Sequence, residues 1–136
     1  MSKRKQIEVS RDKIEEQEKY IEAIHRMNED LFNRTGERKS WLCHTFGCQM
    51  NEHDSEMLIN MLEAMGYVQA LSEDQADLVI YNTCAVRENA ELKVYGNLGH
   101  LKSIKRKRPD MKIVVCGCMM QQEHVVEEIK NRYRHV

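Results

Sequence analysis

The sequence predicts an α/β domain with a mostly parallel sheet flanked by helices, of the Rossmann or flavodoxin-like type, with an extra N-terminal helix. The first observation is that short strand-like runs alternate with longer helical ones from Lys39 onward. The second is that Asp77–Tyr81 and Lys112–Val115 contain Leu-Val-Ile-Tyr and Ile-Val-Val, compact apolar runs typical of buried parallel strands. Because such alternation implies right-handed crossovers, the strands are expected to be parallel, with helices on the faces of the sheet.

Composition limits the class of protein further. The 136 residues are 41% hydrophobic and 32% charged, which suits one ordinary domain with its own core. The formal charge of −1 gives no general argument for nucleic-acid binding. The longest near-apolar run, Ile113–Met120, is far shorter than the roughly 20 residues that cross a bilayer. No secretory signal follows the basic N-terminus, so we expect a cytoplasmic protein without a membrane partner.

Residues 1–38 form a charged extension that differs from the domain expected over residues 39–136. Ser10 is a plausible N-cap and Gly36 a stop signal for one amphipathic helix between them. Packing of this helix on the domain is favoured over binding of a separate partner. Its narrow apolar stripe consists of Ile14, Ile21, Ile24, Met27 and Leu31.

The remaining elements follow from periodicity and from stop signals. Strands are expected at Ser40–Thr45, Tyr67–Ala70, Asp77–Tyr81 and Lys112–Val115. One helix is expected to place Met57, Leu58, Met61, Leu62 and Met65 on one face, with Gly66 just beyond its end. A second helix, over Arg87–Lys107, would bury Leu92, Tyr95, Leu98 and Leu101 and stop at Pro109. Gly96 and Gly99 either weaken this helix prediction or mark close packing. A last helix, over Gln121–Tyr133, would bury Val125, Val126 and Ile129.

Three of the five cysteines occupy equivalent places in this pattern. Cys48, Cys84 and Cys118 each lie three residues beyond the end of a predicted strand and before a predicted helix. Because parallel strands end at one edge of the sheet, the loops that follow them gather there, where α/β proteins bind their ligands. The three thiols are therefore expected to converge in space.

Three convergent thiolates suggest a metal centre with one open position. A 4Fe–4S cluster usually takes four cysteines, so with three one iron is free to bind something else. Zinc held by the same cysteines and either His44 or His124 is the competing assignment. The three thiols could also be small buried apolar groups, and Cys116 with Cys118 could form a redox dithiol. For Cys43 and Cys116, within strand-like runs, burial in the core is preferred.

Polar side chains share the same loops. Taken singly, such residues are often caps or turn formers, whereas together they would donate hydrogen bonds to a cluster or an anion. The candidates for this supporting role are Thr45, Gln49, Asn51, Asn82, Thr83, Arg87 and Gln121.

Several motifs in these regions resemble one known family. They are Thr45-Phe46-Gly47-Cys48-Gln49-Met50-Asn51, Asn82-Thr83-Cys84-Ala85-Val86-Arg87-Glu88, Lys93-Val94-Tyr95-Gly96, and Gly117-Cys118 with Gln121-Gln122. In this order they resemble the N-terminal domain of the radical-SAM methylthiotransferases, in the tRNA-2-methylthio-N6-dimethylallyladenosine synthase branch. The resemblance spans roughly Trp41 to Tyr133.

The resemblance implies a chemistry. Full-length members add a methylthio group at C2 of N6-isopentenyladenosine next to the anticodon of tRNA. Their N-terminal domain binds an auxiliary 4Fe–4S cluster through three cysteines, here Cys48, Cys84 and Cys118, and the open iron is thought to hold the transferred sulfur. A second 4Fe–4S cluster and S-adenosylmethionine belong to the catalytic core.

The sequence also departs from the family pattern. It contains no Cys-x-x-x-Cys-x-x-Cys motif for the cluster that cleaves S-adenosylmethionine, and no C-terminal RNA-binding domain. We therefore expect a fragment of a longer enzyme, truncated near the end of its first domain and inactive alone. Its partners would be the radical-SAM and RNA-binding domains of the same polypeptide and, through them, tRNA.

Overall fold

The computed structural model describes residues 10–46, 49–84 and 90–136. Its centre is a parallel four-stranded sheet in the order β2-β1-β3-β4. The strands are β1 (Ser40–Thr45), β2 (Val68–Gln69), β3 (Leu78–Thr83) and β4 (Lys112–Gly117). The helices are α1 (Arg11–Thr35), α2 (Gln49–Ala64), α3 (Ala90–Lys107) and α4 (Glu123–Arg132), with a short 3-10 helix, η1 (Cys118–Gln121). The predicted α/β class with a parallel sheet and an extra N-terminal helix is confirmed.

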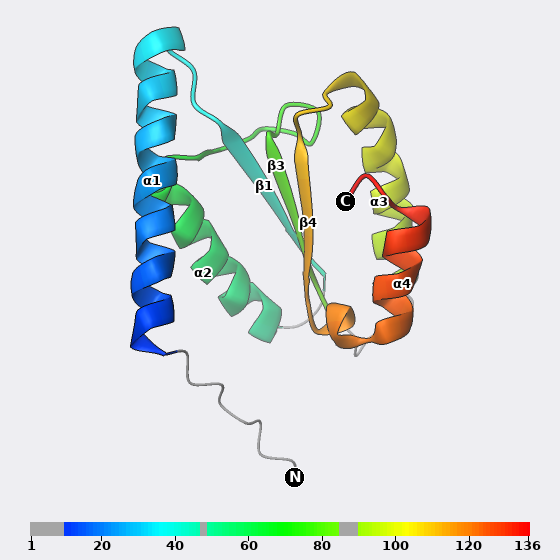
Figure 1. Cartoon of the computed structure of the whole chain (residues 1–136). Helices are drawn as coiled ribbons and strands as arrows, with labels where there is room; N and C mark the ends of the chain where they lie inside the picture. The colour runs from blue at the N-terminus through cyan, green and yellow to red at the C-terminus, as the bar shows by residue number, and fades with distance from the viewer. Residues whose placement is uncertain (1–9, 47–48, 85–89) are drawn as a thin grey trace.

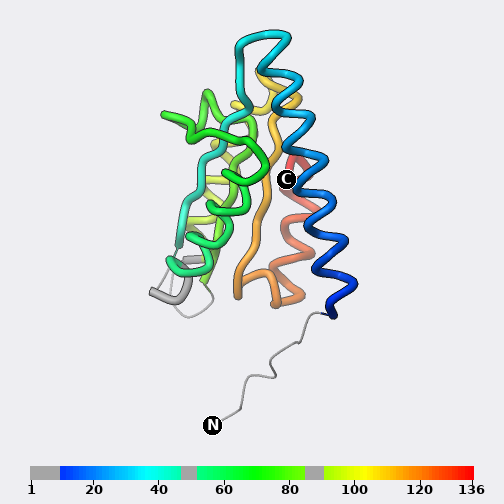
Figure 2. The backbone as a smooth tube through the Cα atoms, turned by 90° about the vertical axis from the view of Figure 1, so that its left-hand side faces the viewer, coloured from blue at the N-terminus to red at the C-terminus, as the bar shows by residue number. Residues whose placement is uncertain are grey.

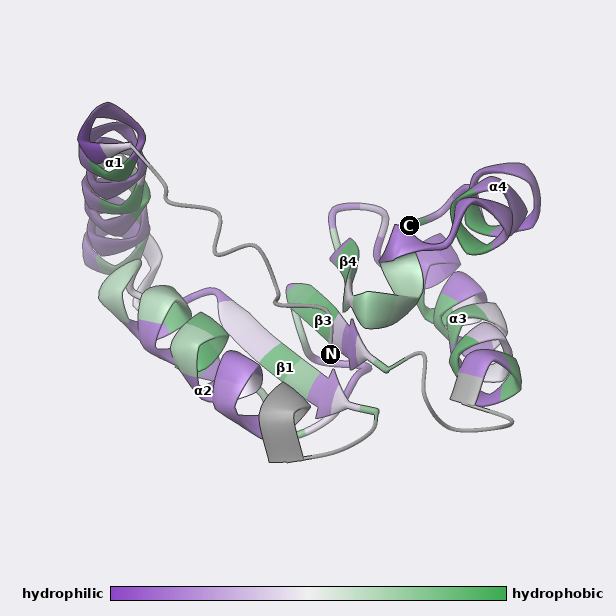
Figure 3. Ribbon diagram, turned by 90° about the horizontal axis from the view of Figure 1, so that it is seen from below, coloured by the Kyte–Doolittle hydropathy of each residue, from purple (hydrophilic) through white to green (hydrophobic). Residues whose placement is uncertain are grey.

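The helices lie on both faces of the sheet, with α1 and α2 on one side and α3 and α4 on the other (Figures 1 and 3). Side chains alternate along each strand, so neighbouring residues enter different cores. Val79 and Tyr81 of β3 belong to the larger core beneath α3 and α4, whereas Ile80 packs with Trp41 and Leu62 beneath α2. No helix among the described residues is long and apolar enough to cross a membrane.

Helix α1 has the predicted caps but packs less of its apolar stripe than expected. The Ser10 side chain accepts a hydrogen bond from the Lys13 N–H, and Gly36, at φ 73°, ends the helix. Met27 is 68% exposed and Ile14 is 45% exposed, so the prediction that both would pack is wrong. The buried residue is Asn28, whose Nδ2 donates to the Met65 carbonyl at 2.7 Å. The reason is that α1 is the outermost helix on this side and lies along α2 (Figures 1 and 2).

Two helices bury most of the predicted face, but each exposes one residue that was expected inside. Leu92 is 67% exposed, whereas Val94, two positions further along α3, is fully buried. Spacings of four, three and three residues then bury Leu98, Leu101 and Ile104, a stripe that Leu92 does not join. In α2, Met57 is likewise exposed, while Leu62 is buried.

Gly96 and Gly99 lie within α3, and the alternative that they mark close packing is not supported. A Cβ built on Gly96 or Gly99 would meet no atom within 4 Å.

The last helix begins later than predicted, because η1 occupies Cys118–Gln121 and α4 starts at Glu123. Its buried residues are Val125 and Ile129, with Val126 only half-buried.

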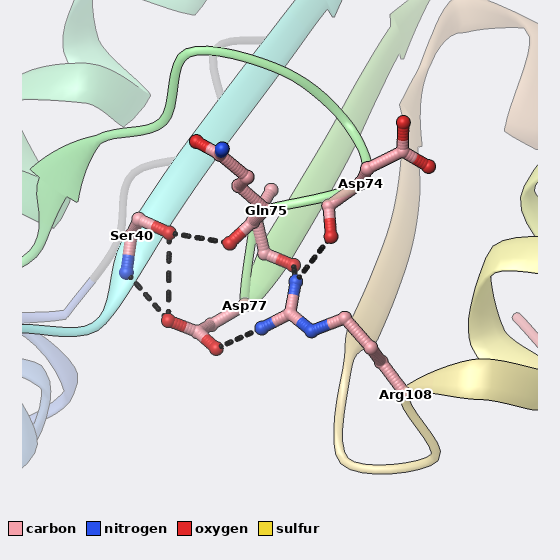
Figure 4. A network of polar contacts seen from close by, with 6 residues as sticks. Ser40, Asp74, Gln75, Asp77 and Arg108 are labelled. Carbon is pink, nitrogen blue, oxygen red and sulfur yellow. Dashed lines mark hydrogen bonds and ion pairs between the residues drawn. The ribbon is translucent and has the colours of Figure 1, made fainter.

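A polar network ties the strand starts together at the amino edge of the sheet (Figure 4). The Asp77 carboxylate accepts a hydrogen bond from the Ser40 N–H at 2.9 Å and from Arg108 Nη2 at 2.7 Å. Arg108 Nη1 also donates to the carbonyls of Ala76 and Asp74. One carboxylate therefore joins β1, the loop before β3 and the end of α3.

We expect Asp77→Ala to lower the free energy of unfolding by about 1–3 kcal/mol, since it leaves Ser40 N–H and Arg108 without their acceptor. Partial exposure of this ion pair holds the loss to the lower part of that range. Urea unfolding measures it, with Asp110→Ala at an exposed position as control. Equal stability of the two variants would show that the network contributes nothing.

Candidate metal centre

The carboxyl ends of β1, β3 and β4 form one edge of the sheet, seen at the bottom of Figure 1. Thr45 is paired with Asn82, and Asn82 with Cys116, so the ends of the three strands are level with one another. A further pair, Thr83 with Gly117, extends β3 and β4 by one residue. Helix α2 and η1 also begin at this edge (Figure 1).

Cys84 and Cys118 leave this edge from neighbouring strands. Each is the first residue beyond the last pair of the ladder, Thr83 with Gly117. The predicted uniform offset of three residues is therefore wrong for both, because β3 and β4 run two residues further than their apolar segments. Cys84 is 2% exposed, whereas Cys118 is partly exposed at the start of η1. The corrected strand ends leave the two cysteines directly after paired residues of neighbouring strands.

The other predicted site residues divide into two groups. Cys48 and Arg87 lie outside the described residues, and Gln49 and Asn51 fall in the first turn of α2, where only the backbone is described. The remaining candidates are placed: Thr45 at the end of β1, Asn82 and Thr83 buried at the end of β3, and Gln121 exposed in η1.

The structure adds Ser55, which the sequence analysis missed. Ser55 belongs to α2 and is 5% exposed. Its Oγ lies 2.7 Å from Thr45 Oγ1 and accepts a hydrogen bond from Asn82 Nδ2 at 3.0 Å. A signal was present in the sequence, because Ser55 precedes Leu58 and Leu62 by three and seven positions and so falls on the apolar face of the helix.

Gly117 fits this edge because it lacks a side chain. Its φ of 98° lies in the left-handed region, and an added Cβ would stand 2.2 Å from the Thr83 carbonyl oxygen and 2.8 Å from Asn82 Oδ1. Thr83 Oγ1 in turn donates to the Cys116 carbonyl at 2.6 Å. The residues before Cys84 and Cys118 are thus held in close mutual contact.

Cys43 and Cys116 are half-buried at the edge of the smaller core beneath α2, close to the predicted core location. Burial raises the pKa of both thiols. A redox dithiol works through a thiol of lowered pKa, so the environment of Cys116 gives no support to a Cys116–Cys118 redox pair.

The two histidines considered for zinc are engaged elsewhere. His44 Nε2 pairs with Glu73 Oε1 at 2.8 Å, and His124 Nε2 lies 3.3 Å from Glu91 Oε1. Zinc bound by Cys84, Cys118 and either histidine would need a group of three such side chains. Within residues 10–46, 49–84 and 90–136 there is no group of three His, Cys, Asp or Glu residues that could hold a metal ion.

The donor set at this edge fits a group bound by thiolates. Cys84 and Cys118 follow the last pair of the β3–β4 ladder, and the polar side chains that end β1 and β3, those of Thr45, Asn82 and Thr83, carry no charge. Soft thiolate ligands favour iron–sulfur clusters, zinc or copper(I) over the hard cations that prefer oxygen. The third sulfur, Cys48, would come from the chain between β1 and α2.

Comparison with known proteins places the chain in a family. The family described as "Uncharacterized protein family UPF0004" matches residues 40–136, which include every strand of the sheet. The chain belongs to this family. It is the family of the N-terminal methylthiotransferase domain, as the motifs around Cys48, Cys84 and Cys118 predicted.

Curated relatives agree with this family. The chain is 68% identical over 136 residues to the tRNA-2-methylthio-N(6)-dimethylallyladenosine synthase of Clostridioides difficile (strain 630). It is 56% identical over 136 residues to the protein of the same name from Alkaliphilus oremlandii (strain OhILAs). Both alignments cover all of this chain but 28% of the relative, so the chain spans a little over a quarter of these relatives' length.

A third relative shows a shorter match. The Bacillus thuringiensis (strain Al Hakam) protein of that name is 51% identical over 105 residues, which is 77% of this chain and 21% of the relative.

Proposed function

We propose that this chain is the auxiliary 4Fe–4S cluster-binding domain of a tRNA methylthiotransferase, with Cys48, Cys84 and Cys118 as the ligands. The observation that carries the proposal is the arrangement of strand ends: Cys84 and Cys118 follow the neighbouring strands β3 and β4 directly. Cys48 is two residues beyond Phe46, whose N–H donates to the Asn82 carbonyl at 2.8 Å.

When bound, such a cluster supplies an iron with an open position, able to hold an exogenous sulfur. The other roles at this edge belong to residues of the chain itself. Cys48, Cys84 and Cys118 would hold the cluster, and the β3–β4 ladder would fix the backbone separation of Cys84 from Cys118. Thr45, Asn82 and Thr83 would supply neutral polar groups at the same strand ends. Gln49, Asn51, Arg87 and Gln121 complete the proposed supporting set.

The substrate and partners are proposed from the relatives' name and from the length they share with this chain. The product is the 2-methylthio derivative of N6-isopentenyladenosine next to the tRNA anticodon. Residues 39–136 contribute the auxiliary cluster and residues 1–38 form an extension with no assigned role. A radical-SAM domain with a second 4Fe–4S cluster and S-adenosylmethionine, and an RNA-binding domain, lie elsewhere in the longer cytoplasmic polypeptide. The chain alone is inactive.

Anaerobic reconstitution of the whole chain with ferrous iron and sulfide tests the proposal. We expect about four iron and four sulfide per chain, as in a single 4Fe–4S cluster, and a visible iron–sulfur absorption that bleaches on reduction. A parallel sample receives zinc instead, and both metals are then offered together. Stoichiometric zinc without cluster formation under these conditions would contradict the proposal and favour a structural zinc domain.

In the longer protein, the auxiliary role makes a separate prediction. Cys84→Ala is expected to abolish formation of the methylthio nucleoside, because the sulfur-holding centre is lost, and to leave cleavage of S-adenosylmethionine intact. Mass spectrometry of nucleosides from digested tRNA measures the first activity and chromatography of the cleavage products the second. Loss of both activities in a folded variant would mean that these thiols serve the catalytic core instead.

A further inference from the structure

Ser55 places a hydroxyl where α2 otherwise presents apolar side chains to the sheet. It is 5% exposed, and Leu58 and Leu62, three and seven positions further along, pack in the core beneath this helix. A buried hydroxyl without partners is costly, so its contacts show what it does there.

These contacts reach two strands. Ser55 Oγ accepts hydrogen bonds from Asn82 Nδ2 of β3 at 3.0 Å and from the Cys43 thiol of β1 at 3.8 Å. A hydroxyl has two lone pairs and one proton. Ser55 Oγ also shares a hydrogen bond with Thr45 Oγ1, 2.7 Å away, in which either hydroxyl can be the donor. The Ser55 hydroxyl therefore has partners on both β1 and β3.

Two hydrogen-bond partners of Ser55 lie two or three residues before proposed cluster ligands in the sequence. Thr45 ends β1 three residues before Cys48, and Asn82 lies two residues before Cys84. The other end of the Asn82 amide reaches β4, because its Oδ1 would stand 2.8 Å from a Cβ on Gly117, the residue before Cys118. One side chain of α2 thus bonds the ends of β1 and β3, and its partner Asn82 closely approaches the end of β4.

We propose that Ser55 is a positioning residue for the thiolate centre: it holds the ends of β1 and β3 in the register that brings Cys48, Cys84 and Cys118 onto one cluster. This inference rests on the proposed function. Ser55 itself needs no contact with the cluster, since it acts through Thr45 and Asn82. Hydrogen bonding around a cluster also sets its reduction potential, so a shifted network is visible in the cluster itself.

The matched comparison is Ser55→Ala with Ser40→Ala. Ser40 also lies at the end of a strand, and its hydroxyl donates a hydrogen bond to the Gln75 carbonyl at 3.1 Å. It lies at the amino edge of the sheet, opposite to the edge that carries the cysteines. Both whole-chain variants are reconstituted anaerobically beside the wild type. The readouts are the rate of iron loss to a chelator, the electron paramagnetic resonance spectrum of the reduced cluster, its reduction potential and the urea unfolding of the apo protein.

We expect Ser55→Ala to lose iron about fivefold faster than the wild type, the change that one hydrogen bond represents, with an altered resonance spectrum and a shifted potential. Ser40→Ala is expected to lower unfolding stability while leaving the cluster's iron loss, spectrum and potential as in the wild type. Ser55→Ala with wild-type values of all three would overturn the positioning role alone. A wild-type chain that binds no cluster would instead overturn the proposed function.

Thr45 supplies a second variant in case Ser55→Ala does not fold, because Thr45 is exposed at the strand end. Thr45→Val removes the hydroxyl that shares a hydrogen bond with Ser55 and is expected to speed iron loss, whereas Thr45→Ser, which keeps the hydroxyl, restores the wild-type rate. The double variant Ser55→Ala/Thr45→Val should lose iron no faster than Ser55→Ala alone, because Ser55→Ala already removes the hydrogen bond to Thr45. If the Thr45→Val variant lost iron at the wild-type rate, the inference would be contradicted.

Discussion

Replacement of Cys48, Cys84 or Cys118 by alanine, one at a time, is expected to abolish stable cluster binding by the reconstituted chain. Each change removes one of three protein ligands, and two thiolates leave two irons of a 4Fe–4S cluster without a protein ligand. Iron and sulfide analysis after gel filtration, with the visible absorption, measures the loss. We expect less than about one-tenth of the wild-type iron to remain after gel filtration, because losing a ligand costs more than the roughly 10–100-fold in affinity that losing an outer-shell partner costs.

Cys43→Ala and Cys116→Ala are the matched controls. Both thiols are half-buried beside the smaller core, away from the positions that follow the strands, and should leave the iron content unchanged. Cys84 is itself buried, so circular dichroism of each apo variant must show a folded chain before the iron content is compared. Loss of the cluster on replacing Cys116 but not Cys118 would contradict the ligand assignment.

Gly117→Ala is expected to be the most destabilising small substitution in the sheet. Its backbone has φ 98°, and the new Cβ would stand 2.2 Å from the Thr83 carbonyl oxygen and 2.7 Å from the Thr83 nitrogen. Both atoms belong to the paired strand and cannot rotate away. Left-handed strain and overpacking together predict a loss of about 3 kcal/mol or more in the free energy of unfolding, measured by urea titration.

Gly96→Ala is the control for this change. It adds the same methyl group inside α3, where nothing lies within 4 Å, and should stabilise the chain by roughly 0.5–1 kcal/mol. We therefore expect the two substitutions to change the free energy of unfolding in opposite directions. A neutral Gly117→Ala would show that β3 and β4 do not approach each other this closely before Cys84 and Cys118.

Strand β3 was predictable because burial on both faces leaves a strong apolar signal. Ser40–Thr45 was predicted to the residue, whereas β3 and β4 ended two residues later than predicted. The residues at these strand ends favour turns when taken singly, yet here they continue the β3–β4 ladder; they are Asn82, Thr83 and Gly117. Cross-strand pairing outweighs the local preference of each residue, and single-residue propensities contain no information about pairing.

The helices show a different limit. Leu92 and Val94 of α3 are both apolar, and periodicity alone does not decide which one faces the sheet. The structure buries Val94 because Leu98 and Leu101 continue its stripe. For the candidate site, the parallel topology predicted that the carboxyl ends of β1, β3 and β4 would share one edge of the sheet. Ser55 did not, because a single serine on an apolar helix face acquires meaning only from its partners on β1 and β3.

The most direct test of the account is an anoxic crystal structure of the reconstituted whole chain. We predict one iron–sulfur centre at the carboxyl edge of the sheet, bonded to the sulfurs of Cys48, Cys84 and Cys118, with one iron lacking a protein ligand. Ordered cysteine loops that hold the three sulfurs apart, with metal bound elsewhere or by fewer of them, would contradict the account.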